Sequence, residues 1–208
     1  MSMLAFVLTA GAAVAQATVT FDDGTALPKG WTSGITGHGA ANWAVIIDET
    51  APTPPHVLRQ SGEATFCWAV KSDAKIKDGF AEVKFKPISG SEDQAGGLVW
   101  RFKDANNYYV VRANALEDNV VLYKTVAGKR SSLQVKGRMF GYGVDTKVPK
   151  GKWSTLRVEF QGNLFTVLFN GERLFQVEDD TLTDAGAVGV WTKADSVTLF
   201  DDFAYGAK

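Results

Sequence analysis

Residues 95–124 constrain the fold most, because three consecutive segments within them alternate apolar and polar side chains with a period of two. Successive side chains on a β-strand point to opposite faces of a sheet, so this pattern predicts three neighbouring strands. Turn-forming residues in KDANN and ALEDN separate the segments. One face of the resulting sheet is apolar enough to pack against a second sheet.

The same short spacing recurs along most of the chain. Asn170 and Gly171 form the strongest hairpin signal, since both central positions of a type I′ turn need positive φ. No segment has a long apolar period of 3.6 residues, and the best helical candidate is about one turn at 179–186. We therefore predict an all-β sandwich or barrel with little helix. The predicted strands are 17–22, 43–47, 65–70, 79–86, 96–103, 107–114, 119–126, 153–161, 164–170, 172–177, 186–192 and 196–205.

The first 15 residues are typical of a signal peptide. An apolar run extends from Leu4 to Ala15, and small residues at Ala13 and Ala15 suit signal peptidase before Gln16. No Lys or Arg precedes the run, and a buried N-terminal helix is the alternative. The run is too short to span a membrane. We expect an exported protein, periplasmic, cell-surface or extracellular, in which residues 16–208 form one domain without a linker or internal repeat.

Charge and cysteine content exclude several classes of function. The 22 Lys and Arg residues balance 23 Asp and Glu residues, so no global field favours nucleic acid or an acidic membrane surface, and any electrostatic preference must be local. Cys67 is the only cysteine, which rules out an intrachain disulfide and remains compatible with export to a bacterial periplasm. It alternates with Phe66 and Trp68, and no paired base is evident. We interpret Cys67 as a small buried strand residue and expect no required cofactor.

A basic face is the main candidate for a binding site. Period-two spacing places basic and amide side chains of the three strands on one face, and the segment 186–205 adds a Trp and a Lys of shared parity. An indole stacks on the C–H faces of a sugar while polar groups meet its hydroxyls. The alternatives are an ordinary solvated face and a Trp packed in the core. The predicted ligand-binding residues are Arg101, Tyr108, Arg112, Asn114, Lys124, Trp191 and Lys193.

Catalytic signals are weak. His38 and His56 lie in contexts typical of loops, and neither neighbours a recognisable nucleophile. Most acidic residues occur as adjacent pairs, which point to opposite faces of a strand, so no strand presents a row of carboxylates for glycoside hydrolysis. Glu117 and Asp118, at a strand end, are the remaining candidates for an acid or base.

Two further acidic pairs indicate a structural calcium site. Asp22 and Asp23 lie near the start of the predicted domain, and Asp201 and Asp202 lie near its end. If the first and last strands pair, these carboxylates meet and form the oxygen-rich environment that calcium prefers. The alternative is a set of acidic turn and edge residues, because no spaced calcium loop accompanies them.

Three stretches carry a resemblance to a known family: GGLVWRFKDANNYYVVRAN, KWSTLRVEFQGNLFTVLFNGERLF and VGVWTKADSVTLFDDF. Over residues 18–205 the chain resembles exported bacterial members of the concanavalin A-like lectin/glucanase superfamily, especially laminin-G-like and 3-keto-disaccharide hydrolase domains. The resemblance implies a jelly roll of two antiparallel sheets with a carbohydrate ligand on the concave face. The E-x-D-x-E strand of the glucanases is absent. In AGGLVWR, Arg101 matches the terminal Arg of the hydrolase motif, but the Asn and Ser of that motif are absent.

Three functional hypotheses follow. The first is an exported domain that binds a saccharide or an acidic glycan on the concave sheet. The second is a glycoside hydrolase-like enzyme acting on 3-keto-disaccharides, with Glu117 or Asp118 as acid or base. The third is an envelope domain that contacts another protein. Fold class alone does not choose among them, and the sequence sets no oligomeric state.

Overall fold

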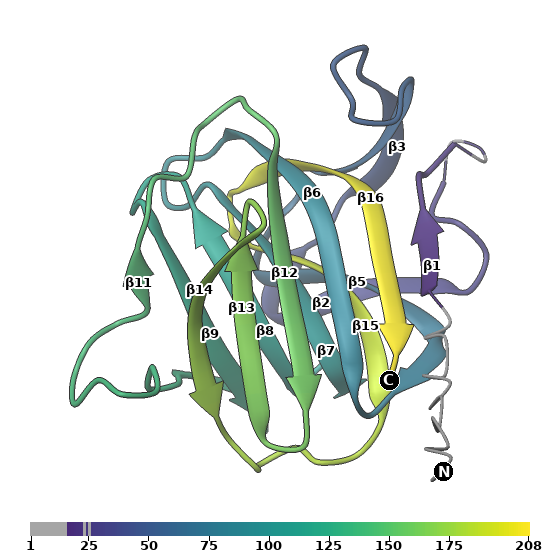
Figure 1. The fold of residues 1–208 in the computed structure, drawn as a ribbon. Helices are drawn as coiled ribbons and strands as arrows, with labels where there is room; N and C mark the ends of the chain where they lie inside the picture. The colour runs from purple at the N-terminus through teal and green to yellow at the C-terminus, as the bar shows by residue number, and fades with distance from the viewer. Residues whose placement is uncertain (1–15, 23, 25) are drawn as a thin grey trace, which may run out of the picture.

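A computed structural model describes residues 16–22, 24 and 26–208, and in this part of the chain two antiparallel sheets form a sandwich (Figure 1). The described residues contain no helix, hence none that could cross a membrane. Sheet A contains, in order, β14 (Glu172–Glu178), β13 (Leu164–Phe169), β12 (Ser154–Gln161), β6 (Gly79–Ser89), β16 (Val197–Ala207), β4 (His56–Gln60) and β3 (Trp43–Ile47), with β1 (Gln16–Val19) beside β16. Sheet B contains β10 (Lys129–Ser132), β9 (Asn119–Val126), β8 (Asn107–Asn114), β7 (Ala95–Asp104), β15 (Gly186–Ala194), β5 (Glu63–Ile76) and β2 (Trp31–Ala40), with β11 (Val144–Asp145) beside β9.

Apolar side chains of both sheets fill the space between them. Trp100 of β7 is fully buried and stacks on Tyr109 of β8, with ring centroids 5.4 Å apart. It also stacks on Phe160 of β12 across the sandwich, at 6.1 Å. Large aromatic side chains bury the most apolar surface per residue, so these contacts fix how the sheets are stacked. The predicted jelly-roll sandwich is therefore confirmed.

The predicted strands and turns agree closely with the structure where alternation is strong. β8 and β9 have the predicted bounds, and Asn170 and Gly171 have φ values of 50° and 83°, as a type I′ turn requires. The predicted helical turn at 179–186 is wrong, because that segment is coil leading into β15.

Four strands have no counterpart in the sequence prediction: β2, β4, β10 and β11. β2 contains three glycines and two threonines and lacks an apolar alternation, while β4 follows a proline-rich loop. As a result His38 and His56, predicted in loops, lie in strands β2 and β4. These strands form because their neighbours supply hydrogen bonds, which single-strand patterns do not reveal.

Candidate functional site

The outer face of sheet B, opposite sheet A, is filled by a second apolar cluster. The rings of Phe66 and Trp191 lie 5.2 Å apart, and those of Phe102 and Tyr108 lie 5.3 Å apart. Trp191 and Tyr108 are both fully buried. The expectation that Trp191 offers an exposed stacking surface is therefore wrong, and the alternative, a Trp packed in the core, is confirmed. The cluster consists of Phe66, Val70, Val99, Phe102, Tyr108, Val110, Val121, Tyr123, Ala187 and Trp191.

Arg101 does not join this face. The pairing of β7 with β8 shifts register after Trp100, and Arg101 has a φ of 45°. Such a bulge re-aims the side chain. The guanidinium donates to the backbone oxygens of Lys77, Leu182 and Gly162 at 3.0, 2.9 and 2.6 Å and is 1% exposed. It therefore ties loops together at one end of the sandwich.

Lys124 also leaves the predicted face. Register pairs Arg112 with Val121, so Tyr123 and Val121 share its face, while Lys124 pairs with Tyr109 on the other. A one-residue difference in register moves every side chain of a strand to the opposite face. Lys124 instead contacts the carboxylate of Asp179 at 2.7 Å.

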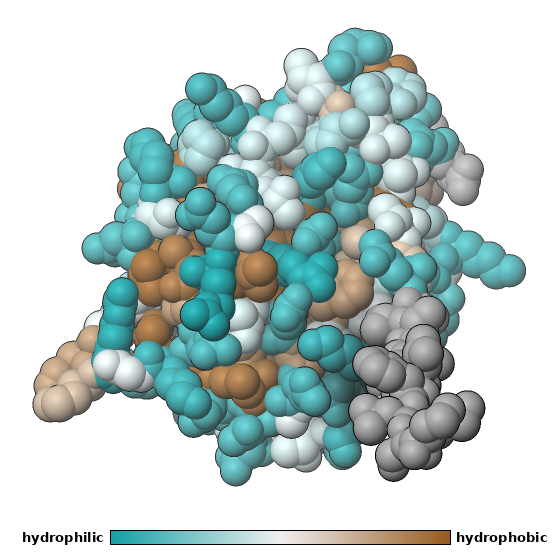
Figure 2. Space-filling view, in the orientation of Figure 1, coloured by the Kyte–Doolittle hydropathy of each residue, from teal (hydrophilic) through white to brown (hydrophobic). Residues whose placement is uncertain are grey.

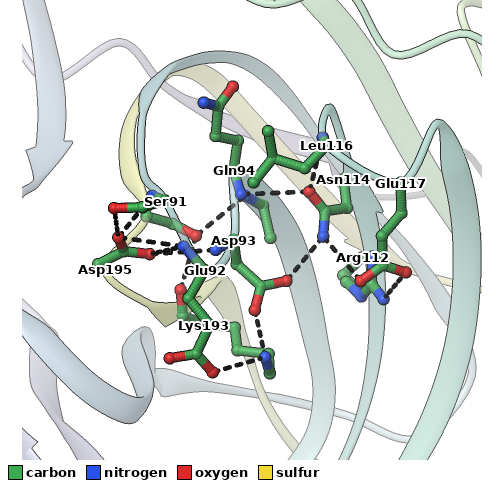
Figure 3. Close-up of polar contacts among 12 residues, drawn as sticks. Ser91, Glu92, Asp93, Gln94, Arg112, Asn114, Leu116, Glu117, Lys193 and Asp195 are labelled. Atoms are coloured by element: carbon green, nitrogen blue, oxygen red, sulfur yellow. Dashed lines mark hydrogen bonds and ion pairs between the residues drawn. The ribbon is translucent and has the colours of Figure 1, made fainter.

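The remaining predicted residues meet in a polar network at one edge of the filled face (Figure 3). Arg112 is 99% buried by its neighbours, since its side chain is 1% exposed. It donates to Glu117 at 2.8 Å, to Asn119 at 3.0 Å and to the hydroxyls of Tyr123 and Tyr142 at 3.3 and 3.2 Å. Every face of the guanidinium is thus occupied by the chain itself, so Arg112 organises the site.

Asn114 connects this half of the network to a second half. Its amide nitrogen donates to Asp93 at 2.6 Å and to Glu117 at 3.1 Å. Asp93 is 1% exposed and forms an ion pair with Lys193, which also reaches Glu92 at 3.4 Å. Burial of a carboxylate is tolerated only with such partners. The network therefore holds Lys193 and Glu117 in fixed positions at the surface.

The loop that carries Glu92 and Asp93 is held by Asp195. The carboxylate of Asp195 accepts the backbone N–H groups of Ser91, Glu92 and Asp93 at 2.5 to 3.0 Å. Partial burial raises the pKa of Asp195, but these backbone donors outweigh it and lower the pKa to about 2. The ionised carboxylate therefore fixes the loop at all ordinary pH values. The sequence offered no signal for this role.

A surface depression of about 540 Å³ opens beside the network. Glu92 and Lys193 belong to both, and Figure 3 shows them at the same side of the close-up. The side chain of Glu92 is 70% exposed and that of Glu117 is 39% exposed, so both carboxylates are accessible to a ligand. The depression is lined by His38, Gly39, Glu63, Ala64, Thr65, Glu92, Lys193 and Ala194.

The two predicted acid or base candidates differ in their surroundings. Burial raises the pKa of Glu117, but hydrogen bonds from Arg112 and Asn119 outweigh it and hold the pKa below its usual range. Glu117 is therefore an ionised, partly exposed carboxylate. Asp118 points away from the network, where it accepts the N–H of Val148 at 3.0 Å and pairs with Lys147 at 2.7 Å. Only Glu117 belongs to the candidate site.

The acidic pairs near the two ends of the domain satisfy one condition for the calcium site, because β1 and β16 pair. The carboxylate of Asp201 is fully buried and accepts the N–H of Thr53 at 2.8 Å, while Asp202 pairs with Lys84 at 2.7 Å. Asp22 lies 3.5 Å from the Nδ1 atom of His56. Asp23 and the predicted signal peptide, 1–15, lie outside the described residues.

Among the described residues, no three His, Cys, Asp or Glu side chains are arranged to hold a metal ion. The calcium site stays a prediction. Cys67 is fully buried, and burial raises the pKa of its thiol to about 11, as a structural cysteine requires.

Comparison with known proteins places this geometry in context. A family model described as 3-keto-alpha-glucoside-1,2-lyase-like domain matches residues 16–202. A search of curated proteins gave no significant match.

Solved structures share the fold at low sequence identity. Carbohydrate-binding module CBM66 from Bacillus subtilis has a TM-score of 0.65 at 20% identity, covering 84% of this chain and 93% of that chain. Cellulose induced protein Cip1 has a TM-score of 0.65 at 11% identity, covering 91% and 96%. The β-glucanase of Bacillus licheniformis has a TM-score of 0.57 at 12% identity, covering 93% and 98%.

Proposed function

The chain belongs to the 3-keto-alpha-glucoside-1,2-lyase-like domain family, and from this premise we propose that it binds a saccharide at the edge of the outer face of sheet B. The observation that carries the proposal is the fixed network from Glu117 to Lys193, of which Lys193 and Glu92 line the depression of about 540 Å³. Sugar hydroxyls need donors and acceptors whose positions are set before binding. The likeness to a carbohydrate-binding module supports the same proposal.

The ligand contacts in this proposal come from exposed groups, while buried ones hold them in place. Glu92, Glu117 and Lys193 face the surface and would meet hydroxyls through charge-assisted hydrogen bonds. Arg112 is unsuitable as a test residue, because its truncation removes four hydrogen bonds of the network together, and a loss of binding could then reflect a loss of structure. Glu117→Gln keeps the shape of the side chain but removes its charge and replaces one of its two acceptor oxygens with a donor NH₂ group.

A glycan array followed by calorimetry tests the proposal. We expect Glu117→Gln to weaken binding of the selected glycan by about tenfold, since a hydrogen bond to a charged group contributes about 1.5–3 kcal/mol and the amide retains part of it. Glu49→Gln, an exposed carboxylate in the loop between β3 and β4, is the matched control and should leave affinity unchanged. Equal affinities for wild type and Glu117→Gln would refute this placement of the site.

A second function is favoured by the family match itself. A 1,2-elimination on a 3-keto-glucoside needs a base for the C2 proton, which the neighbouring ketone acidifies, and a proton for the departing C1 oxygen. Glu117 is an ionised carboxylate, and the hydroxyl of Tyr142 accepts a hydrogen bond from the same Arg112 nitrogen that donates to Glu117. Incubation with 3-keto-glucosides, followed by ultraviolet detection of an enone, tests turnover. Binding without turnover favours the first function. The absence of both glycan binding and turnover favours an envelope interaction domain.

We also propose that the protein is exported, on the basis of residues 1–15 alone. N-terminal sequencing of the mature protein tests this, with Gln16 expected as the first residue. An unprocessed Met1 in protein recovered from the producing cells would contradict it.

A further inference from the structure

A loop with an apolar tip projects from the sandwich between β10 and β11 (Figure 1). Met139 and Phe140 at its tip are each 83% exposed, the highest values among the large apolar side chains of the described residues. Figure 2 shows the same region as an apolar projection from an otherwise largely polar outline. Exposing two adjacent large apolar side chains to water is unfavourable in free energy, and such exposure is typical of a surface that contacts a partner.

Both ends of the loop are anchored, so the tip is presented from a fixed base. At one end the N–H of Lys136 donates to the backbone oxygen of Gln176 on β14 at 2.7 Å. At the other end Tyr142 bonds to Arg112 at 3.2 Å. Gly137 and Gly141, on either side of the tip, have φ values of 81° and 139°, a backbone conformation that residues other than glycine rarely adopt.

A basic depression of about 470 Å³ lies at the base of the loop. Three cations line it, Lys136, Arg138 and Arg173, and none of its lining residues is acidic. Lys136 pairs with Glu178, whereas no ion pair within the described part of the chain involves Arg138 or Arg173. The lining is completed by Val135, Gly137, Leu174, Phe175 and Gln176.

We propose that this loop and depression bind the surface of an anionic lipid bilayer. The depression holds a phosphate headgroup through Arg138 and Arg173, and Met139 and Phe140 insert between the upper acyl chains. Basic charge together with a small apolar insertion is the combination that gives reversible attachment to anionic lipids. The net charge of the chain is −1, so the attraction is local to this region.

Other partners fit these features less well. A stable protein interface buries about 1,000 Å² or more, which two projecting side chains do not supply. A saccharide would use the polar groups but not the aliphatic Met139. The proposal does not depend on saccharide binding at Glu117, since none of the side chains proposed to contact lipid is among those proposed to contact the saccharide.

Sedimentation with vesicles of phosphatidylglycerol, compared with vesicles of phosphatidylcholine, tests the proposal on the full chain. We expect binding to the anionic vesicles only, and weakening as salt rises. Replacing both arginines (Arg138→Gln with Arg173→Gln) should reduce affinity by about 25-fold, at about fivefold for each charge. Met139→Ser with Phe140→Ser should reduce it by about tenfold or more. Ile47→Ser, at a side chain 64% exposed on β3, is the control and should stay within about twofold.

Specific outcomes overturn the proposal. Equal sedimentation with both vesicle types, or no loss in the Met139→Ser and Phe140→Ser variant, removes the lipid as partner. Inorganic phosphate that binds with the same dependence on Arg138, without any vesicle binding, assigns the depression to a soluble phosphate compound instead. Glycan affinity measured on the same variants should not change, so failure here is distinguishable from failure of the proposed function.

Discussion

Replacement of Asp195 by Asn should lower stability at neutral pH and should do so through the loop that carries Glu92 and Asp93. The carboxyl has a pKa of about 2 in the folded chain and 3.8 as the ordinary value. This difference in pKa corresponds to at most about 2.5 kcal/mol in the free energy of unfolding at about pH 7. Asp195 is only partly buried, so solvent screening reduces the contribution to about 1–2 kcal/mol.

The pH dependence of this loss has a definite sign. Because folding lowers the pKa of Asp195, its stabilisation is complete above about pH 3.8 and disappears as the pH falls through about 2. Urea denaturation of wild type and Asp195→Asn at about pH 7 and about pH 2.5 measures the difference. We expect a clear gap at the higher pH and a much smaller one at the lower.

Asp184→Asn provides the matched control, since Asp184 is exposed in the coil before β15. Its effect should stay within about 0.5 kcal/mol at both pH values. A loss for Asp195→Asn that is equal at the two pH values would show that shape, not charge, holds the loop. The absence of any loss would refute the role given to the three backbone donors.

Two other substitutions and one chemical reaction test the fold. Trp191→Ala should destabilise the protein by about 3–5 kcal/mol in chemical denaturation, because the indole is fully buried. Gly171→Ala should cost about 1 kcal/mol in the same assay, because the residue has a φ of 83°. Cys67 should stay unreactive toward a thiol reagent in the folded protein and react fully in guanidinium; rapid modification of the folded chain would contradict its burial.

The sequence predicted the fold well wherever local alternation coincides with tertiary burial. β8 alternates between Tyr109 and Val111, which face sheet A, and Tyr108 and Arg112, which face outward, as period two requires. Strands without such alternation were not predicted, as the Gly- and Thr-rich β2 shows. Local pattern is informative only when the two faces of a strand meet different environments.

The candidate site was harder to predict, because two side chains depend on register and not on parity. Arg101 is re-aimed by a bulge, and Lys124 lies one residue out of step with Arg112. Neither property appears within one strand, since both arise from pairing with a neighbour. The anchors Asp93 and Asp195 were also missed, because their roles depend on contacts about 100 residues apart.

The burial of the outer face explains why the site lies at its edge. A strongly curved sheet brings side chains of distant strands together, and Thr36 of β2 reaches the hydroxyl of Tyr108 on β8 at 3.0 Å. Aromatic side chains then pack against one another on this face, so that neither Trp191 nor Tyr108 is exposed for a sugar to stack on. Polar side chains at the edge of this face cannot be buried without hydrogen-bond partners, so they form the network around Arg112. Their outer members, Glu117 and Lys193, stay partly exposed, which is why we propose them as ligand contacts.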